Sequence, residues 1–321
     1  MSDNHPPIRF DRFMDRALHD PQTGYYARRI TGVGRGGDFT TAPTLSAVTG
    51  KAIAAWAAAA MKECGTSNLI EIGPGEGRLA AAVLEHLPWI TRLRTKLHLV
   101  ETSQPLAEIQ RKLLRGRAIW HRTPTEALLA CGGKAVIFSN ELVDAFPVRC
   151  FRKSESGWEE LAVRLEPPVE EVWQEVERLP HSSSFAVAHP TGQRIEVHES
   201  YHLWLAGWMP LWKAGRMLTI DYGAEAGDLY HRRPKGSVRA YLLQQRLEGL
   251  AVYGNPGRQD LTADVNFTDL SEWSREWAGE GTLRTFGGFL EPFLDPANPA
   301  DAYLADQSGP GGAFLVLDQK R

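Results

Sequence analysis

The segment Leu69–Gly77 combines an acid with a run of glycines that could bring a ligand close to the backbone. Its sequence, LIEIGPGEG, places Glu71 in an apolar run and then puts Gly73, Gly75 and Gly77 at alternate positions. A helical pattern begins directly afterwards, so the segment predicts a strand, a tight loop and a helix start. Glycine suits such a loop because it accepts positive φ and lets the backbone approach a ligand closely. This geometry is typical of sites for nucleotide-like cofactors.

The spacing of the glycines narrows the choice of cofactor. A dinucleotide-binding loop reads G-x-G-x-x-G and needs glycine at position 78, where this chain has Arg78. No Gly-Lys-Ser/Thr follows, so the pattern of a phosphate-binding P-loop fails as well. A second apolar run ends in Glu101, and an acid there can bind ribose hydroxyls. That placement suits S-adenosylmethionine (SAM) and NAD alike, and a plain strand–helix turn is the alternative that the loop alone leaves open.

A second polar group follows the apolar run that ends at position 139. It consists of Asn140, Glu141 and Asp144. Because ligands of open α/β sheets bind outside the carboxyl ends of the strands, both acids would face the same crevice as the glycine loop. The alternative is that Asn140 caps a helix while the two acids complement its dipole. The two interpretations are compatible with each other.

Strands and helices alternate through the region that carries these residues. Strands are expected at 68–72, 96–101, 117–121 and 134–139, with helices at 77–87 and 103–115. Such alternation predicts a parallel sheet, and the expected fold class is therefore α/β.

The flanking regions follow other patterns. A helix is expected over residues 10–18, and an alanine-rich helix from about Ser46 to Met61. Residues 147–179 alternate and carry glycine and proline, which indicates antiparallel strands. A Trp-rich helix at about 201–213 precedes further strands, expected at 216–221, 282–286 and 313–318. Long insertions between core strands usually carry function, so they predict substrate recognition.

Composition limits the kinds of partner. The 321 residues carry a net charge of −3 and no long basic run, which argues against a general nucleic-acid binder. No stretch approaches the roughly 18 apolar residues of a membrane span, and the start of the chain lacks an apolar signal core. The three cysteines are scattered, as thiols of a reducing compartment would be. We expect a cytoplasmic protein that binds neither nucleic acid nor membrane.

Two further patterns suggest sites but have simpler explanations. The segment His198–His202 matches H-E-x-x-H of zinc proteases, yet Leu205 stands where the longer form needs glycine, so we expect no metal. Trp204, Trp208 and Trp212 recur as one helical stripe, which is typical of a core or a subunit contact. The stripe leaves a homodimer open.

Several ordered blocks resemble the MidA-type methyltransferases, a SAM-dependent family that includes a mitochondrial complex I assembly-factor methyltransferase. The E-x-G-x-G loop resembles the first motif of SAM methyltransferases. The blocks that carry the family resemblance are FDRFM (10–14), DPQTGYY (20–26), GDFTTAP (37–43), EIGPG (71–75), VETS (100–103), SNELVDAFP (139–147), LTIDYG (218–223), VRAY (238–241) and PGRQDLTADV (256–265). Together they are far more specific than the glycine loop.

The resemblance implies a class I methyltransferase fold, Rossmann-like, with helices on both faces of a mostly parallel sheet. It also implies SAM as cofactor and, in the mitochondrial member, a protein arginine as methyl acceptor. We expect residues 1–62 to form a helical extension with a cofactor-covering loop. The core would comprise 63–146 and 201–321, and 147–200 would be an inserted substrate-recognition segment.

The resemblance and the motif positions together give a set of candidate site residues. The residues expected to hold SAM are Glu71, Gly73, Pro74, Gly75, Glu101, Thr102, Ser103 and Asn140, with Asp38, Phe39, Thr41 and Pro43 from the covering loop. Glu141 and Asp144 are expected to orient an acceptor arginine, because carboxylates bind a guanidinium in a bidentate way and offset its charge. Asp221 could supply a further acid from the fifth strand.

The chain also departs from the family pattern. Gln244 stands where His is frequent, Asn266 where Asp is expected, Thr44 where Glu is common, and Phe286 near a usual Gln. These positions lie outside the cofactor loop, so they bear on the acceptor. A small-molecule O- or N-methyltransferase and a SAM-binding assembly factor with little turnover are the alternatives to methylation of a protein arginine.

Overall fold

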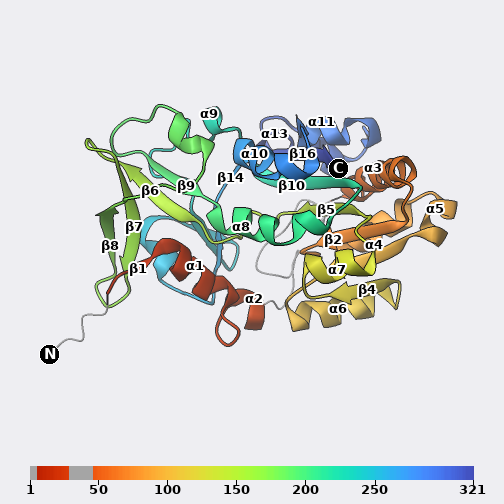
Figure 1. Cartoon of the computed structure of the whole chain (residues 1–321), viewed down its shortest axis with the longest axis horizontal. Helices are drawn as coiled ribbons and strands as arrows, with labels where there is room; N and C mark the ends of the chain where they lie inside the picture. Colours follow the sequence, from red (N-terminus) through yellow and green to blue (C-terminus); the bar gives the residue numbers. More distant parts are fainter. Residues whose placement is uncertain (1–5, 29–45) are drawn as a thin grey trace. The chain divides into compact units, whose positions relative to one another are not determined.

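The computed structural model describes residues 6–28 and 46–321, which fall into two compact units (Figure 1). The described residues of Thr31–Leu142, Trp204–Gly223 and Ser271–Arg321 form the larger unit. Those of Met1–Ile30, Val143–Leu203 and Ala224–Leu270 form the smaller one. The division into 1–62, 63–146 with 201–321, and 147–200 stays a prediction.

The larger unit centres on a mixed sheet with the strand order β15-β16-β10-β5-β2-β3-β4. Its strands are β2 (Asn68–Ile72), β3 (Lys96–Val100), β4 (Ala118–His121), β5 (Val136–Asn140), β10 (Arg216–Ala224), β15 (Thr282–Thr285) and β16 (Phe314–Lys320). The strands from β4 to β10 are parallel to one another, and β16 runs antiparallel to both of its neighbours. The predicted α/β fold with a mostly parallel sheet is confirmed.

Helices cover both faces of this sheet. They include α3 (Val48–Cys64), α4 (Arg78–His86), α5 (Trp89–Arg94), α6 (Gln104–Leu114), α7 (Pro124–Ala130), α11 (Phe286–Leu290), α12 (Pro299–Ala305) and α13 (Pro310–Ala313). The crossovers through α4 and α6 run from β2 outward to β4, whereas the crossover through α7 returns to β5. Because such crossovers are right-handed, α7 packs on the face opposite α4 and α6. The sequence pattern alone does not predict the short helices α5 and α7.

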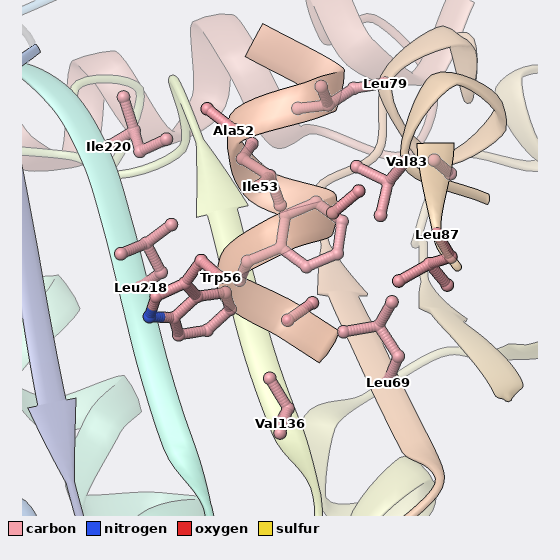
Figure 2. Close-up of a cluster of buried hydrophobic side chains, with 14 of the residues drawn as sticks. Ala52, Ile53, Trp56, Leu69, Leu79, Val83, Leu87, Val136, Leu218 and Ile220 are labelled. Atoms are coloured by element: carbon pink, nitrogen blue, oxygen red, sulfur yellow. The ribbon is translucent and has the colours of Figure 1, made fainter. Parts of the chain in front are cut away.

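The core of the larger unit lies between α3, α4 and one face of the sheet. Figure 2 shows Ile53 and Trp56 of α3 among strand residues such as Val136 and Leu218. Small residues let α3 and α4 approach closely, since a Cβ added at Gly50 would lie 2.6 Å from the Ala82 Cβ. This packing supports the strand β2 and the loop that follows it.

The smaller unit is built from antiparallel strands. One sheet has the order β1-β7-β6-β9 with β8 on β7, and another has the order β12-β11-β13. The strands of these two sheets are β1 (Ile8–Arg9), β6 (Arg149–Lys153), β7 (Trp158–Arg164), β8 (Glu170–Glu175), β9 (Arg194–Val197), β11 (Arg239–Leu242), β12 (Gln245–Leu247) and β13 (Asp260–Thr262). The unit also contains the two-residue strand β14 (Val265–Asn266) and the helices α1 (Phe10–His19), α2 (Tyr25–Arg28) and α9 (Ala226–Leu229). The antiparallel strands predicted within 147–179 are confirmed.

The Trp-rich helix ends earlier than its spacing predicts. Helix α8 (Glu199–Trp208) stops before Pro210, and Trp212 follows a short 3-10 turn. Proline has no N–H to continue a helical hydrogen-bond pattern, so the three tryptophans do not share one helix. The prediction of a single stripe is therefore wrong for Trp212. Trp208 and Trp212 are buried, and the Trp212 indole donates a 3.0 Å hydrogen bond to the Ala135 carbonyl, so both belong to the core.

Candidate active site

The glycine loop after β2 has a backbone that only glycine adopts readily. Gly73, Gly75 and Gly77 all have positive φ, at 68°, 53° and 81°. The Gly73 amide donates to the Val100 carbonyl at 3.1 Å, and the Gly77 amide donates to the Pro74 carbonyl at 2.8 Å. A Cβ at Gly73 would lie 2.7 Å from Leu142 Cδ1, whereas a Cβ at Gly75 would meet no described atom within 4 Å. The loop is thus packed at Gly73 and open at Gly75.

A buried glutamine ties this loop to the acid that follows β3. Gln110 of α6 donates from Nε2 to the Gly75 carbonyl at 2.6 Å and to Glu101 Oε2 at 3.0 Å. Its Oε1 accepts the Trp120 indole N–H at 2.9 Å, so the whole amide is engaged. The Ser103 amide donates to the other Glu101 oxygen at 2.7 Å. Gln110 therefore fixes the position of Glu101 relative to the loop.

Sequence reasoning missed Gln110, although a signal was present. On α6 the buried residues Leu106, Ala107 and Leu114 form an apolar stripe, and Gln110 occupies the same stripe. A polar side chain on the buried face of a helix needs hydrogen-bond partners, because an unpaired buried amide is costly. Such a residue close in sequence to a candidate ligand-binding acid is a candidate positioning residue.

Two acids beside the loop carry raised pKa values. Burial, and then the charge of Glu101, raises the pKa of Glu71 to about 8. Glu71 is 2% exposed, and its Oε2 has no hydrogen-bond partner among the described residues. Burial also raises the pKa of Glu101, although the amides of Ser103 and Thr102 and the Gln110 side chain oppose this rise. In their ionised forms these two acids would bind a cationic ligand and repel an anionic pyrophosphate.

A third carboxylate, Glu141, follows the end of β5 beside the middle of β10 and has an unusual backbone conformation. Glu141 has φ 49°, a region that residues other than glycine rarely occupy. The backbone amide of Glu141 donates a hydrogen bond to the Ile220 carbonyl at 2.9 Å. Its carboxylate Oε1 accepts a hydrogen bond from the side-chain amide of Asn140 at 3.1 Å. The fully buried Asp221 accepts the Leu142 amide at 3.2 Å and the Tyr222 amide at 2.9 Å. Asp221 thus fixes the backbone directly after Glu141.

The helix-capping alternative for Asn140 is wrong. The chain passes from β5 to β6 without a helix, so neither Asn140 nor the acids after it serve a helix terminus there. The backbone turns that carry Glu141 are instead held by β10 through the Ile220 carbonyl and Asp221. Asn140 contacts the Glu141 carboxylate directly.

Asp144, the second predicted acceptor acid, belongs to the smaller unit. It is buried, and its backbone carbonyl accepts the Ala263 amide at 3.0 Å. The Tyr26 hydroxyl donates to Asp260 at 2.9 Å. Burial, followed by the charges of Asp260 and Asp144, raises the pKa of Tyr26 well above its usual value. Three of the sequence blocks singled out above therefore meet in this unit around Tyr26, Asp144 and Asp260.

A match to a protein-family model identifies the family of this protein. A model of S-adenosyl-L-methionine-dependent methyltransferases matches residues 52–285, which is most of the chain. The chain belongs to this family. The resemblance to MidA-type methyltransferases, the class I fold and the assignment as a SAM-dependent methyltransferase are confirmed.

Individual relatives of this methyltransferase are distant but cover much of it. Protein arginine methyltransferase NDUFAF7, mitochondrial, of Danio rerio is 26% identical over 86% of this chain and 70% of its own length. The protein of the same name from Homo sapiens is 26% identical over 82% of this chain and 65% of its own length. The chain thus spans about two thirds of the curated relatives that it matches. A crystal structure from Burkholderia thailandensis with bound S-adenosylhomocysteine is 25% identical, with a TM-score of 0.83 over 98% of this chain and 88% of that one.

The residues around the loop fit the family's cofactor, S-adenosylmethionine. When bound, this cofactor supplies a methyl group on a positively charged sulfonium that leaves readily. The unpartnered oxygen of buried Glu71 and the open space at Gly75 are features that a cationic ligand beside the loop would use. We propose that Glu71 binds the amino group of the cofactor and that Glu101, held by Gln110 and Ser103, binds its ribose hydroxyls.

We expect the affinity for S-adenosylmethionine to rise with pH up to about 8, the value to which the pKa of Glu71 is raised. Below that pH the free protein holds Glu71 protonated, whereas an ammonium group prefers the ionised acid, so binding releases a proton. The dissociation constant should fall roughly tenfold per pH unit between pH 6 and 7.5. Calorimetric titrations in buffers of different ionisation enthalpy measure both the affinity at each pH and the number of protons released on binding. Glu71→Gln should show weak binding without this pH dependence, and a flat wild-type profile would contradict the proposed role.

Part of the predicted site lies outside the described residues. Asp38, Phe39, Thr41 and Pro43, expected in the loop that covers the cofactor, fall there together with Thr44. Their roles stay predictions.

Two of the three described departures from the family pattern, Asn266 and Phe286, have a local structural explanation, and that of Gln244 has none. The Asn266 Nδ2 donates to the hydroxyls of Ser183 and Ser184 at 3.0 Å, which an ionised aspartate could not do. Its Oδ1 accepts the Thr268 amide where α10 (Phe267–Ala278) begins. Phe286 is fully buried in the core of the larger unit. Gln244 has φ 64° in the turn between β11 and β12.

The zinc-protease pattern lies at the junction of β9 and α8. Burial lowers the pKa of His198 to about 3, so this imidazole is neutral. Among residues 6–28 and 46–321, no three His, Cys, Asp or Glu side chains are grouped as a metal site would require.

Proposed function

We propose that this methyltransferase transfers the methyl group to a protein arginine. Its curated relatives in Danio rerio and Homo sapiens carry the name protein arginine methyltransferase. An arginine acceptor stays protonated until it reacts, so its site needs carboxylates that offset the guanidinium charge. The observation that carries the proposal is the strained Glu141, held directly after the carboxyl end of β5 by Asn140 and by Ile220 and Asp221 of β10. Strained residues persist where function requires their position.

The carboxylates have separate roles in this proposal. Glu141 is the group that binds the guanidinium and accepts its proton as methylation removes charge delocalisation. Asp144, the second acid predicted to orient the acceptor, lies in the smaller unit, and its role stays a prediction. Asp221 is a positioning residue, because its carboxylate accepts two backbone amides and so fixes the turn after Glu141.

Methyl transfer to a cell extract tests the proposal. The protein is incubated with extract and S-adenosylmethionine carrying a tritiated methyl group, and the products are separated into protein and small-molecule fractions. We expect label in protein, released as methylated arginine after acid hydrolysis. Label in the small-molecule fraction, or on lysine or a carboxyl group, would overturn the arginine assignment. As a control, calorimetric titration with S-adenosylhomocysteine shows whether the protein used in the assay binds its cofactor product.

A further inference from the structure

One edge of the larger unit combines exposed apolar side chains with unpaired cations. On the six-residue helix α5, Trp89 is 65% exposed, Ile90 48% and Leu93 76%. Leu113, near the end of α6, is 38% exposed. Large apolar side chains gathered on so short a segment mark interaction sites in soluble proteins, because water solvates them poorly.

Within the two segments that carry these side chains, 86–100 and 109–120, all charged side chains are cations. Residues 86–100 contain Arg92, Arg94 and Lys96 and no acid, in a chain whose net charge is −3. Residues 109–120 contain Arg111, Lys112, Arg115 and Arg117, again without an acid. All seven cations are exposed, and none makes an ion pair with a described acidic residue. Cations near the end of α6 complement its dipole, but that effect explains neither the cations of α5 nor the exposed tryptophan.

Strand pairing brings the two segments together. Lys96 begins β3 and Arg117 directly precedes β4, and the next residues, Leu97 and Ala118, are paired in the sheet. The last residues of α5 and of α6 therefore lie on the same side of the sheet, where the parallel strands begin (Figure 1). We define the basic apolar edge as Trp89, Ile90, Leu93 and Leu113 together with Arg92, Arg94, Lys96, Lys112, Arg115 and Arg117.

We propose that the basic apolar edge docks this methyltransferase on the surface of a membrane that contains anionic lipid. Tryptophan and aliphatic side chains at a bilayer interface enter the boundary between headgroups and acyl chains, while flanking arginine and lysine side chains contact anionic headgroups. No described helix has the length and apolarity to span a bilayer. The proposed contact is peripheral, and it revises the expectation of no membrane partner, which rested on spanning segments.

Other occupants fit the basic apolar edge less well. A nucleic acid would satisfy the cations, but the exposed aliphatic side chains Ile90, Leu93 and Leu113 would gain little from phosphates. In a twofold dimer each copy presents the same surface, so the same cations would face one another across the interface. Of these three occupants, only an anionic bilayer offers both a negative surface and an apolar interior.

Docking at this edge would leave the cofactor loop accessible. Glu71, Gly73 and Glu101 lie at or after the carboxyl ends of β2 and β3, whereas Lys96 and Arg117 lie at the amino ends of β3 and β4. In a parallel sheet all amino ends of the strands lie on one side and all carboxyl ends on the opposite side. The proposal is therefore independent of the acceptor and can fail or succeed without affecting the assignment as an arginine methyltransferase.

Flotation of the full chain with lipid vesicles tests the proposal. We expect co-flotation with vesicles of phosphatidylcholine and phosphatidylglycerol, weakening with added salt, and none with phosphatidylcholine alone. The variants Trp89→Ala/Leu93→Ala and Arg94→Glu/Arg117→Glu should each lower the bound fraction at low salt at least about tenfold. Trp89 emission, taken as the difference between wild type and Trp89→Phe, should shift to shorter wavelength on anionic vesicles.

Matched controls separate docking from folding. Leu250→Ala removes a leucine that is 60% exposed elsewhere, and Lys235→Glu reverses an exposed cation elsewhere, so both should float like wild type. Every variant should bind S-adenosylhomocysteine with wild-type affinity, because none of these residues is assigned to the cofactor. Equal binding to neutral vesicles, no binding to anionic ones, or full binding by the two edge variants would overturn the proposal. So would a concentration-dependent dimer that Trp89→Ala/Leu93→Ala abolishes.

Discussion

Valine in place of Gly75 is expected to lower the affinity for S-adenosylhomocysteine on the order of 100-fold, the upper end of what overpacking a site costs. The added Cβ meets no described protein atom within 4 Å, so the larger side chain can be accommodated in the free protein. It would, however, occupy the open side of the loop, where we place the cofactor. The φ of 53° adds roughly 1–2 kcal/mol of backbone strain for a residue with a Cβ. Calorimetric titration measures the affinity, and thermal melting measures the strain.

Gly65 provides a matched control for this substitution. It ends α3 with φ 61°, and a Cβ there also meets no described atom within 4 Å. Gly65→Val should therefore lower thermal stability about as much as Gly75→Val while leaving the affinity for S-adenosylhomocysteine unchanged. Wild-type affinity in both variants would place the cofactor away from Gly75. Equal losses of affinity would show that strain in the backbone, and not the position of the side chain, controls binding.

The sequence is sufficient to predict the strands and the glycine loop of the larger unit, for a physical reason. Parallel strands read as continuous apolar runs, and each turn at their carboxyl ends requires particular residues, such as Gly73 and Gly75 after β2. The strands β2 to β5 are accordingly predicted to within two residues at either end. Glu71 and Glu101 are identifiable as strand-end acids because their positions follow directly from this pattern.

Contacts that join distant segments are harder to predict from sequence. The bridge from Gln110 to the Gly75 carbonyl depends on how α6 packs, which periodicity does not specify. The raised pKa of Glu71 depends on burial and on a neighbouring acid thirty residues away. Asp221 shows the same limit, since its strand is predictable but its bonds to the Leu142 and Tyr222 amides are not. Helix α5 is missed for another reason: its apolar side chains face solvent, so the core-facing pattern is absent.

Glu141→Gln is expected to lower kcat/KM for the protein acceptor on the order of 100- to 1000-fold, the effect typical of removing one preorganised electrostatic contact. The substitution keeps the size of the side chain and an oxygen that can accept the Asn140 amide. It removes the negative charge that would offset the guanidinium and accept its proton, so the loss should appear mainly in kcat. The measurement is the initial rate of labelled-methyl transfer to the acceptor fraction identified in the extract assay.

Two controls make the Glu141→Gln result specific to the acceptor. The affinity of the variant for S-adenosylhomocysteine should remain within about twofold of wild type, because the cofactor loop does not use this carboxylate. Glu85→Gln removes the charge of an exposed acid on α4 and should leave the transfer rate unchanged. A transfer rate within a fewfold of wild type for Glu141→Gln would remove this residue from the acceptor site. A large loss would place Glu141 at the acceptor, where its carboxylate offsets charge or accepts the proton.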